Sequence, residues 1–290
     1  MVKGDAYGHG IVEVAKYVEP FVYGFGVANL EEGVRLRENN ISKPILVCQC
    51  LPQEMAVAKE YNLVATVGNF QALSSAKKMA VSVALKINTG MNRFGFDTNE
   101  IHCLKTKIED IPLTDVYSHL YSQDSAESQR QTFDKAVEYL GVNCQSHIGA
   151  SLTAKDSDDI VRVGYNCYKG AMTVESRVVA VRKLQKGDNV GYGNTFEYSG
   201  YVAWVFGGYA DGINRQNPQP VLIGGKICPT VAVCMDTICV YTGDYQCKVG
   251  EVAVLQNRLI TAEFIAEKTN TIPYTVLTGR NGRINRIYTK

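Results

Sequence analysis

Short apolar runs alternate with amphipathic segments through the first half of the chain. The amphipathic segments, such as Leu30–Glu38, Ala72–Met79 and Ser128–Leu140, carry apolar residues three and four positions apart, which is the spacing of a helix with one buried face. The apolar runs between them are bounded by turn residues, as buried strands are. The predicted strands are Met1–Lys3, Val22–Ala28, Ile45–Gln49, Leu63–Gly68, Val83–Asn88, Leu113–Leu120, Val142–Gly149 and Ile160–Asn166.

Strands that alternate with helices predict a parallel sheet, and eight such units predict a closed barrel of the TIM type. Beyond about residue 172 the alternation stops, and β-rich segments follow with glycine, aspartate and asparagine turns between them. We therefore expect an α/β protein with a (β/α)8 TIM-type barrel in residues 1–173 and a mainly β domain in residues 174–290. The second domain has predicted strands at Val178–Leu184, Tyr201–Phe206, Val221–Ile227, Val231–Val240 and Val252–Leu255, and one predicted helix at Thr261–Lys268.

Composition narrows the class of protein. The 290 residues are 46% hydrophobic and 20% charged, which suits one large domain or two moderate ones, and a net charge of +1 argues against a nucleic-acid or anionic-membrane surface. No apolar run is long enough to cross a membrane and no signal peptide is visible, so we expect a cytoplasmic protein. The nine scattered cysteines predict reduced thiols and no zinc site, with Cys48 and Cys50 packed on one face of a buried strand.

Reactive side chains recur at the carboxyl ends of the predicted strands, which is the end where barrel enzymes hold their active sites. Each of these side chains also fits a structural role, so it is their shared position that predicts a site. They are Lys3, Lys86, His119, His147 with Ser151 after it, and Arg162 with Gly164 after it.

The opening stretch carries the most specific of these signals. Lys3 ends a short apolar start and is followed by Gly4, Gly8 and Gly10, with Tyr7 between them. A lysine at such a turn is either an ordinary surface side chain or, once its amine loses its proton, a nucleophile that can form a Schiff base. The stretch closely resembles the V-K-A-D/N-A-Y-G-H-G motif of the alanine racemases, with Gly4 in place of alanine. The resemblance implies that Lys3 carries pyridoxal 5'-phosphate (PLP).

A second stretch, Leu85–Gly95, is similar to the K-x-D/N-T-G-M-x-R-x-G motif of the same family. The resemblance implies that Arg93 binds the substrate carboxylate, a task that suits a guanidinium fork, and assists the phenolic oxygen of PLP. It also implies that Lys86 is the counterpart of a lysine that many relatives carry as a carbamate, which pairs with that arginine. Without the resemblance, Lys86 would be a barrel-interior lysine paired with a carboxylate.

The later barrel motifs extend the likeness to the ring and phosphate of PLP. Arg162 lies in a segment similar to V-R-P/F-G-x-x-x-Y, which implies that it donates to the pyridine nitrogen, whereas a buried arginine alone predicts an ion pair with a barrel carboxylate. His119 matches the histidine of T/S-H-F/L, which implies a bridge between Arg162 and a catalytic tyrosine, whereas a lone histidine is more often a satisfied core residue. The implied phosphate ligands are Ser151, Gly164, the backbone amides that follow it at Tyr165, and the hydroxyl of Tyr7.

Three turns of the second domain complete the resemblance, and each alone would be an ordinary turn. In chain order they are similar to the family motifs V-S-Y-G-x-T/R, G-Y-A/G-D-G and C-M-D. The resemblance implies that the first turn supplies a catalytic base and that the other two form a substrate gate and part of the substrate pocket. The side chains concerned are Tyr192, Tyr209, Met235 and Asp236.

Taken as a whole, the resemblance implies a PLP-dependent isomerase that interconverts L- and D-alanine and supplies D-alanine for cell-wall peptidoglycan. Two bases on opposite faces of the substrate would move the α-proton, Lys3 on the D-face and Tyr192 on the L-face. In the family the tyrosine comes from the partner subunit, which implies a homodimer with shared active sites. A small amino acid is the other partner implied.

Two departures from the family leave alternatives open. The family has a few tens of residues before its cofactor lysine, so we expect this chain to be incomplete at that end. Near the other end, Asn281 or Gly282 stands where a tyrosine usually narrows the alanine pocket, and a smaller or polar residue would admit serine. A serine or serine/alanine racemase of the VanT type is therefore the main alternative.

Three more remote alternatives belong to other classes of protein. A non-racemising PLP-binding homeostasis protein is a single barrel, so the β-rich second half disfavours it. A decarboxylase of the same two-domain plan is disfavoured by the Tyr-Gly-His-Gly sequence at Tyr7. A non-enzymatic barrel accounts for none of the motifs.

Overall fold

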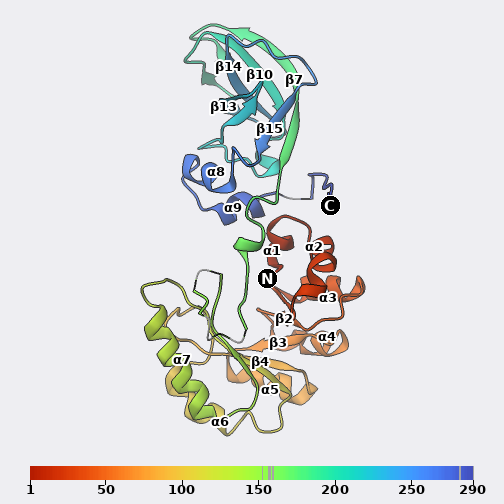
Figure 1. Cartoon of the computed structure of the whole chain (residues 1–290), viewed down its shortest axis with the longest axis vertical. Coiled ribbons are helices and arrows are strands. Elements are labelled where there is room, and N and C mark those ends of the chain that lie inside the picture. The colour runs from red at the N-terminus through yellow and green to blue at the C-terminus, as the bar shows by residue number, and fades with distance from the viewer. Residues whose placement is uncertain (152, 156–157, 159, 281, 290) are drawn as a thin grey trace. The chain divides into compact units, whose positions relative to one another are not determined.

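The computed structural model describes residues 1–151, 153–155, 158, 160–280 and 282–289. The chain divides into two compact units, one of Met1–Ala6 and Gly10–Cys167 and the other of Tyr7–His9 and Tyr168–Lys290. Figure 1 labels the main elements of both units. The expected domain boundary after residue 173 stays a prediction.

In the first unit, helices surround a parallel sheet (Figure 1). Within the described residues the strands follow one another in sequence order, each pairing in parallel with the next. The strands are β1 (Phe25–Val27), β2 (Ile45–Val47), β3 (Val64–Val67), β4 (Val83–Lys86), β5 (Leu113–Tyr117) and β6 (Gln145–His147). The helices are α2 (Ile11–Val18), α3 (Leu30–Glu38), α4 (Met55–Glu60), α5 (Phe70–Met79), α6 (Ile101–Lys105) and α7 (Ala126–Leu140), with 3-10 turns η1 (Glu19–Phe21), η2 (Pro52–Glu54), η3 (Thr98–Glu100) and η4 (Tyr165–Cys167).

The sequence explains the burial of β4 and the starts of α3 and α5. Strand β4 is buried along its whole length, including Lys86, as is typical of parallel strands that are covered on both faces. Asn29 and Asn69 begin α3 and α5 because each side chain accepts a hydrogen bond from the backbone N–H three residues on. The segments that follow the carboxyl ends of β4, β5 and β6 contain the predicted site residues Arg93, His119 and Ser151.

The first predicted strand, Met1–Lys3, is not a strand. Lys3 begins the helical turn α1 (Lys3–Tyr7), which ends the extended run at once. The backbone N–H of Val2 still donates to Gly26 O in β1, 2.9 Å away. The segment thus joins the sheet through a single hydrogen bond.

The last predicted strand, Ile160–Asn166, is also not a strand. It meets the end of β6 through an isolated parallel bridge between Ala150 and Arg162, and then turns into η4. The amino group of Met1 donates to Val163 O at 2.8 Å. Single contacts therefore connect the two ends of the parallel sheet.

The prediction that Cys48 and Cys50 share the face of a buried strand is wrong. Strand β2 ends at Val47, so both cysteines lie in the loop after it, where they are half-buried. Each of the nine cysteines, all of them in the described part of the chain, is a free thiol.

In the second unit an antiparallel sheet forms the main layer (Figure 1). In the described part its strand order is β12-β11-β15-β7-β10-β14-β13, and a separate hairpin pairs β8 with β9. Val205, Ile238 and Val240 lie in the buried core of the large sheet. The strands are β7 (Val174–Leu184), β8 (Asn189–Val190), β9 (Asn194–Thr195), β10 (Gly200–Phe206), β11 (Val221–Ile223), β12 (Lys226–Cys228), β13 (Thr230–Val233), β14 (Thr237–Gly243) and β15 (Val252–Gln256), and the helices are η5 (Tyr209–Asp211), α8 (Ala262–Lys268) and α9 (Pro273–Thr278).

Two predicted strands of this unit are hairpins. Val221–Ile227 folds back at Gly224 and Gly225, whose φ angles of 56° and 78° suit a two-residue hairpin turn. Val231–Val240 is broken at Cys234–Asp236, between β13 and β14. Helix α9 is a second helix where one was predicted, and it begins at a proline, a residue favoured at that position. The predicted fold class, a TIM-type α/β barrel followed by a mainly β domain, is confirmed.

Candidate active site

Lys3 lies at the start of a helical turn with left-handed geometry. The φ and ψ angles are 65° and 45° at Gly4, 52° and 47° at Asp5, and 54° and 50° at Ala6. Such angles cost an L-residue roughly 1–2 kcal/mol each, because Cβ approaches the carbonyl oxygen. Contacts outside the turn must therefore hold it in place.

Glu32, on the first turn of α3, provides those contacts. Its Oε1 accepts hydrogen bonds from the backbone N–H groups of Gly4 (2.7 Å) and Asp5 (3.2 Å), and its Oε2 accepts one from Ala28 (2.7 Å). One carboxylate thus joins the residues after Lys3 to the end of β1. Sequence analysis missed this role, although the Asn29-x-x-Glu32 spacing resembles a capping box and marks the side chain as one that bonds backbone amides.

We expect Glu32→Ala to lower the free energy of unfolding by about 2 kcal/mol, since three amides lose a charged acceptor. Urea unfolding of the cofactor-free protein measures this change. Glu31→Ala is the matched control, because Glu31 is the exposed neighbour on the same helical turn and should cost little. Equal midpoints for the two variants would contradict the role of Glu32.

Lys86 lies at the end of β4 and is 3% exposed. Its Nζ has only long hydrogen-bond contacts, 3.4 Å to Ile87 O and 3.4 Å to Ser118 Oγ. Burial, together with the nearby charges of Arg162 and Arg93, lowers the pKa of Lys86 to about 7. The alternative of a lysine paired with a carboxylate finds no such partner among the described residues.

Arg93 lies on the loop between β4 and η3, and its side chain is exposed. This loop returns to the sheet, since Phe96 N–H donates to Lys86 O at 2.8 Å. Gly95 makes the return possible, because a Cβ there would lie 2.9 Å from Asn88 N and 3.0 Å from Lys86 O. The loop therefore places Arg93 beyond the end of β4, and its charge helps to depress the pKa of the buried Lys86 amine.

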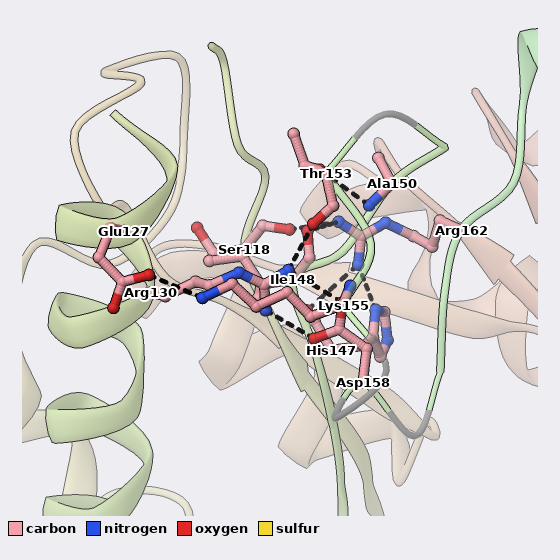
Figure 2. A network of polar contacts seen from close by, with 10 residues as sticks. All are labelled: Ser118, Glu127, Arg130, His147, Ile148, Ala150, Thr153, Lys155, Asp158 and Arg162. Carbon is pink, nitrogen blue, oxygen red and sulfur yellow. Dashed lines mark hydrogen bonds and ion pairs between the residues drawn. The ribbon is translucent and has the colours of Figure 1, made fainter. Parts of the chain in front are cut away.

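The guanidinium of Arg162 spans the ends of β5 and β6 (Figure 2). It donates to Ser118 O, to His147 O at 3.2 Å and to Ile148 O at 3.2 Å, and it contacts Nδ1 of His147. The expected ion pair with a barrel carboxylate is not found among the described residues. Carbonyl groups and one imidazole hold the charge instead, so a charged guanidinium sits at the rim without a fixed anion.

His147, to which the sequence assigned no role, is the histidine that contacts Arg162. Its Nε2 lies 3.5 Å from Asp115 Oδ1, and its ring stacks on Tyr117 with centroids 5.2 Å apart. Burial lowers the pKa of His147, which favours the neutral ring beside the arginine. The position of His147 at the end of a predicted strand was the signal available in the sequence.

His119 follows β5 on the same rim. Burial, and then the charges of Arg162 and Lys86, lower the pKa of His119 to about 4, so its ring is neutral at pH 7. Its backbone oxygen accepts a hydrogen bond from Gln129 Nε2 at 3.2 Å. The described hydrogen bonds of Arg162 go elsewhere, so the expected bridge from His119 to a tyrosine stays a prediction.

The implied phosphate ligands are divided between the two units. Gly164 N–H donates to Ser151 Oγ at 2.9 Å, which brings the segments after β6 and after Arg162 together, and Tyr165 begins η4 next to them. Tyr7 belongs to the second unit, where its ring stacks on Tyr168 with centroids 4.8 Å apart. The first group forms a compact cluster of donors at the rim.

In the second unit Tyr192 occupies the tip of the β8–β9 hairpin. Gly191 and Gly193 flank it with φ angles of 65° and 82°, and the tyrosine is 70% exposed. A phenol exposed at the tip of a hairpin can reach into a cleft of another protein chain. Its role as a base stays a prediction.

The other two matched turns are joined to each other. A Cβ on Gly208, beside Tyr209, would lie 2.2 Å from Met235 O, so the backbones touch there. Arg283, which sequence analysis did not single out, contacts Asp211 Oδ1 (3.3 Å) and Asp236 Oδ1 (2.6 Å). The two turns thus share one arginine. Of the two positions proposed for the missing tyrosine, Asn281 lies outside the described residues, and a Cβ on Gly282 would meet no atom within 4 Å.

The charges at the rim suit an anionic cofactor. Lys3, Lys86, Arg93 and Arg162 all belong to the first unit, and none of them has an ion pair with a carboxylate in the part of the chain that is described. Uncompensated like charges attract an anion. The hydroxyl of Ser151, which accepts the N–H of Gly164, can donate its own O–H to such an anion. These residues fit a phosphorylated ring that also carries a phenolic oxygen.

Family models match the chain from end to end. "Alanine racemase, N-terminal domain" matches residues 1–171, and "Alanine racemase, C-terminal domain" matches residues 171–288. The chain is 34% identical to the alanine racemase of Thermodesulfovibrio yellowstonii, over 99% of this chain and 88% of that protein. It is 31% identical to the alanine racemase of Ligilactobacillus salivarius, over 99% and 90%.

Solved structures give the same result. The alanine racemase of a D-cycloserine-producing Streptomyces lavendulae is similar with a TM-score of 0.92 and 28% identity, over 100% of this chain and 89% of that one. The alanine racemase of Bacillus anthracis, solved with bound L-Ala-P, is similar with a TM-score of 0.90 and 26% identity, over 100% and 87%.

Proposed function

Because this chain belongs to the alanine racemase family, we propose that it interconverts L- and D-alanine with PLP as its cofactor. The observation that supports this most is a cluster of basic side chains that, in addition to burial, lower the pKa of His119 at one rim of the barrel and have no ion pair with a carboxylate among the described residues. They are Lys3, Lys86, Arg93 and Arg162. Lys3 would bind the cofactor covalently, and Ser151 with the amides near Gly164 would bind its phosphate. The left-handed turn held by Glu32 would fix the lysine in place.

PLP, when bound, supplies an electron sink that stabilises the charge left on the α-carbon when its proton departs. Arg162 would face the pyridine nitrogen of the cofactor. Because a guanidinium does not give up its proton, that nitrogen would stay unprotonated and the electron sink would be weaker. A weaker sink favours simple return of the proton over side reactions. Arg93 would bind the substrate carboxylate with a two-pronged contact.

Two bases on opposite faces would then set the stereochemistry. Lys3 would remove or donate a proton on the D-face and Tyr192 on the L-face. In each direction one base would take the α-proton and keep it, and the other base would donate its own proton to the opposite face. Tyr209, Met235 and Asp236 would border the substrate, with Arg283 holding their two turns together.

Tyr192 is 70% exposed in the single chain, which supports its delivery to a partner subunit. We therefore propose a homodimer in which each active site takes its L-face base from the other chain. The D-alanine formed would supply peptidoglycan synthesis in the cytoplasm. For the membrane question, the described residues contain no helix with the length and apolar content needed to span a bilayer.

A chiral assay tests the proposed activity directly. Purified protein supplied with PLP is mixed with L-alanine or L-serine, and the D-isomer is measured as a function of substrate concentration. We expect kcat/KM for alanine to exceed that for serine. The serine alternative is kept because Gly282 leaves open space at a position where the family usually has a tyrosine. A preference for serine would favour it, and no racemisation of either would remove the proposal.

Lys86 is proposed to carry a carbamate. A neutral amine and CO2 form the carbamate and release one proton, and a pKa of about 7 makes the neutral amine abundant at physiological pH. The added negative charge would face Arg93 and Arg162, whose charges depress that pKa. The carbamate on Lys86 would thus give Arg93 and Arg162 the anionic partner that no described carboxylate provides.

We expect removal of CO2 at pH 8 to lower the activity several-fold and bicarbonate to restore it. At fixed dissolved CO2, the restored activity should rise as pH increases through about 7, because protonation of the amine opposes the reaction. Lys86→Arg should show no response to bicarbonate, and its intact mass should lack the adduct. The same CO2 response in that variant would place the carbamate elsewhere.

A further inference from the structure

The chain between β6 and Arg162 forms a loop that is closed at its base. Arg162 N–H donates to Gly149 O at 3.1 Å, and Ala150 bridges to Arg162. Inside the loop, Thr153 N–H donates to Ala150 O at 2.9 Å, and Ala150 N–H donates to Thr153 Oγ1 at 3.2 Å. Ser151, which is implied in phosphate binding, lies within this loop. Its position therefore depends on what fixes the loop to the barrel.

Arg130, on α7, holds the loop through Asp158 (Figure 2). Its two terminal nitrogens lie 2.6 Å and 2.9 Å from the two carboxylate oxygens of Asp158, and Nη2 also donates to Thr153 O. Both side chains are only 9% exposed. Asp158 Oδ2 in turn accepts the N–H of Lys155 at 2.9 Å. A fork-to-fork pair of this kind fixes orientation as well as distance.

Gly149, two residues after β6, contacts the same carboxylate. A Cβ built on it would lie 2.3 Å from Asp158 Oδ2 and 3.1 Å from Asp158 Cγ. The carboxylate is therefore seated directly against the strand end, at a position that only glycine leaves open. Helix α7, the loop and β6 meet at this one carboxylate.

From these contacts we infer that Arg130 and Asp158 are positioning residues for the phosphate of PLP. The pair touches neither the reacting atoms nor the implied phosphate donors. It fixes Asp158 and Thr153 to α7, and these two residues lie in the same stretch between β6 and Arg162 as Ser151. Because Ser151 Oγ accepts Gly164 N–H at 2.9 Å, a displaced loop would separate the donors of the cluster. This inference rests on the proposed use of PLP.

A second link between the same helix and loop serves as a matched control. Lys155 Nζ lies 2.7 Å from Glu127 Oε2, but these side chains are 49% and 65% exposed. Exposed pairs contribute little, whereas breaking a buried pair leaves a charge without its partner. If the loop acts on the cofactor, the buried pair should matter and the exposed pair should not.

The experiment titrates the cofactor-free full chain with PLP and, separately, with pyridoxal, which lacks the phosphate, and follows binding by absorbance. For Arg130→Gln and for Asp158→Asn we expect the Kd of PLP to rise about tenfold or more. The Kd of pyridoxal should stay unchanged, because the defect lies in phosphate binding. Lys155→Ala should bind both ligands as the unaltered chain does.

Gly149→Ala provides an independent variant that keeps both charges. Its methyl group should push the Asp158 carboxylate away from β6 and give the same selective loss of PLP affinity. Unchanged PLP binding in all three variants would overturn the inference. So would an equal loss of PLP and pyridoxal affinity, or a loss of the folded state in all three, since either result marks a purely structural pair. If the unaltered chain binds neither PLP nor pyridoxal, the proposed function itself fails, whatever the variants do.

Discussion

Lys3→Ala is expected to abolish both covalent cofactor attachment and racemisation. The alanine side chain has no amine, so borohydride should fix no PLP on the protein, and the visible absorbance of the unaltered holoenzyme should be absent. Loss of the D-face base adds to the loss of cofactor orientation, and we expect the rate to fall by about 10 000-fold or more. Absorbance spectra and the chiral alanine assay measure the two effects on one sample.

Lys16→Ala is the control for Lys3→Ala, because Lys16 is an exposed lysine on the helix that follows. It should keep the spectrum and the activity of the unaltered protein. A Lys3→Ala protein that still holds PLP after borohydride treatment would assign the attachment to another amine, with the buried Lys86 the first to examine.

Tyr192→Phe is expected to keep the cofactor spectrum and lose racemisation by about 100- to 10 000-fold. The variant removes a single hydroxyl from an exposed hairpin tip, so folding and cofactor binding should be unaffected. In deuterated water, Lys3 should still exchange the α-proton of D-alanine without inverting it. L-alanine should keep its proton, because the base on that face is gone. Proton NMR of separate samples, one started from pure D-alanine and one from pure L-alanine, follows the loss of the α-proton signal in each.

Tyr198→Phe is the matched control, since Tyr198 is another partly exposed tyrosine of the same unit, 47% exposed, and no role is proposed for it. It should racemise alanine at the normal rate. Exchange of both isomers by Tyr192→Phe, or undiminished racemisation, would remove Tyr192 from the mechanism.

The parallel half of the fold was predictable because its signals are local. Strands β1 to β4 lie in largely apolar runs of the sequence. Asn29 and Asn69 mark helix starts by their side-chain chemistry. The strands Met1–Lys3 and Ile160–Asn166 were predicted wrongly because sequence shows apolar content but not pairing. Met1–Lys3 makes one hydrogen bond to β1, and Ile160–Asn166 makes one isolated bridge to the residues after β6. Neither segment forms the repeated backbone hydrogen bonds of a strand pair.

In the second unit, two predicted strands are hairpins, because a turn lies inside each apolar run of the sequence. Gly224 and Gly225 were read as part of one strand, although paired glycines are a hairpin signal. The turn at Cys234–Asp236 has no glycine, and only the pairing of β13 with β14 reveals it. Strand limits depend on partners that lie far away in the sequence.

The candidate site was predictable where a motif names the residue and unpredictable where a residue acts through others. Lys3, Arg93 and Arg162 stand in specific motifs. Arg130 and Glu32 do not, because their roles depend on which backbone groups the fold brings within reach. His147 shows the same limit, since its position was noted but its contact with Arg162 depends on how two strand ends align.

The left-handed turn after Lys3 has a practical consequence for anyone who wishes to move this lysine into another barrel. The opening stretch holds no acceptor for the amides of Gly4 and Asp5, and the carboxylate that satisfies them belongs to Glu32 on a separate helix. A graft of residues 1–10 alone would relax toward the right-handed form preferred by L-residues and would swing the amine to a new direction. The transplantable module is therefore the stretch, the strand that follows it and the first turn of α3, taken together.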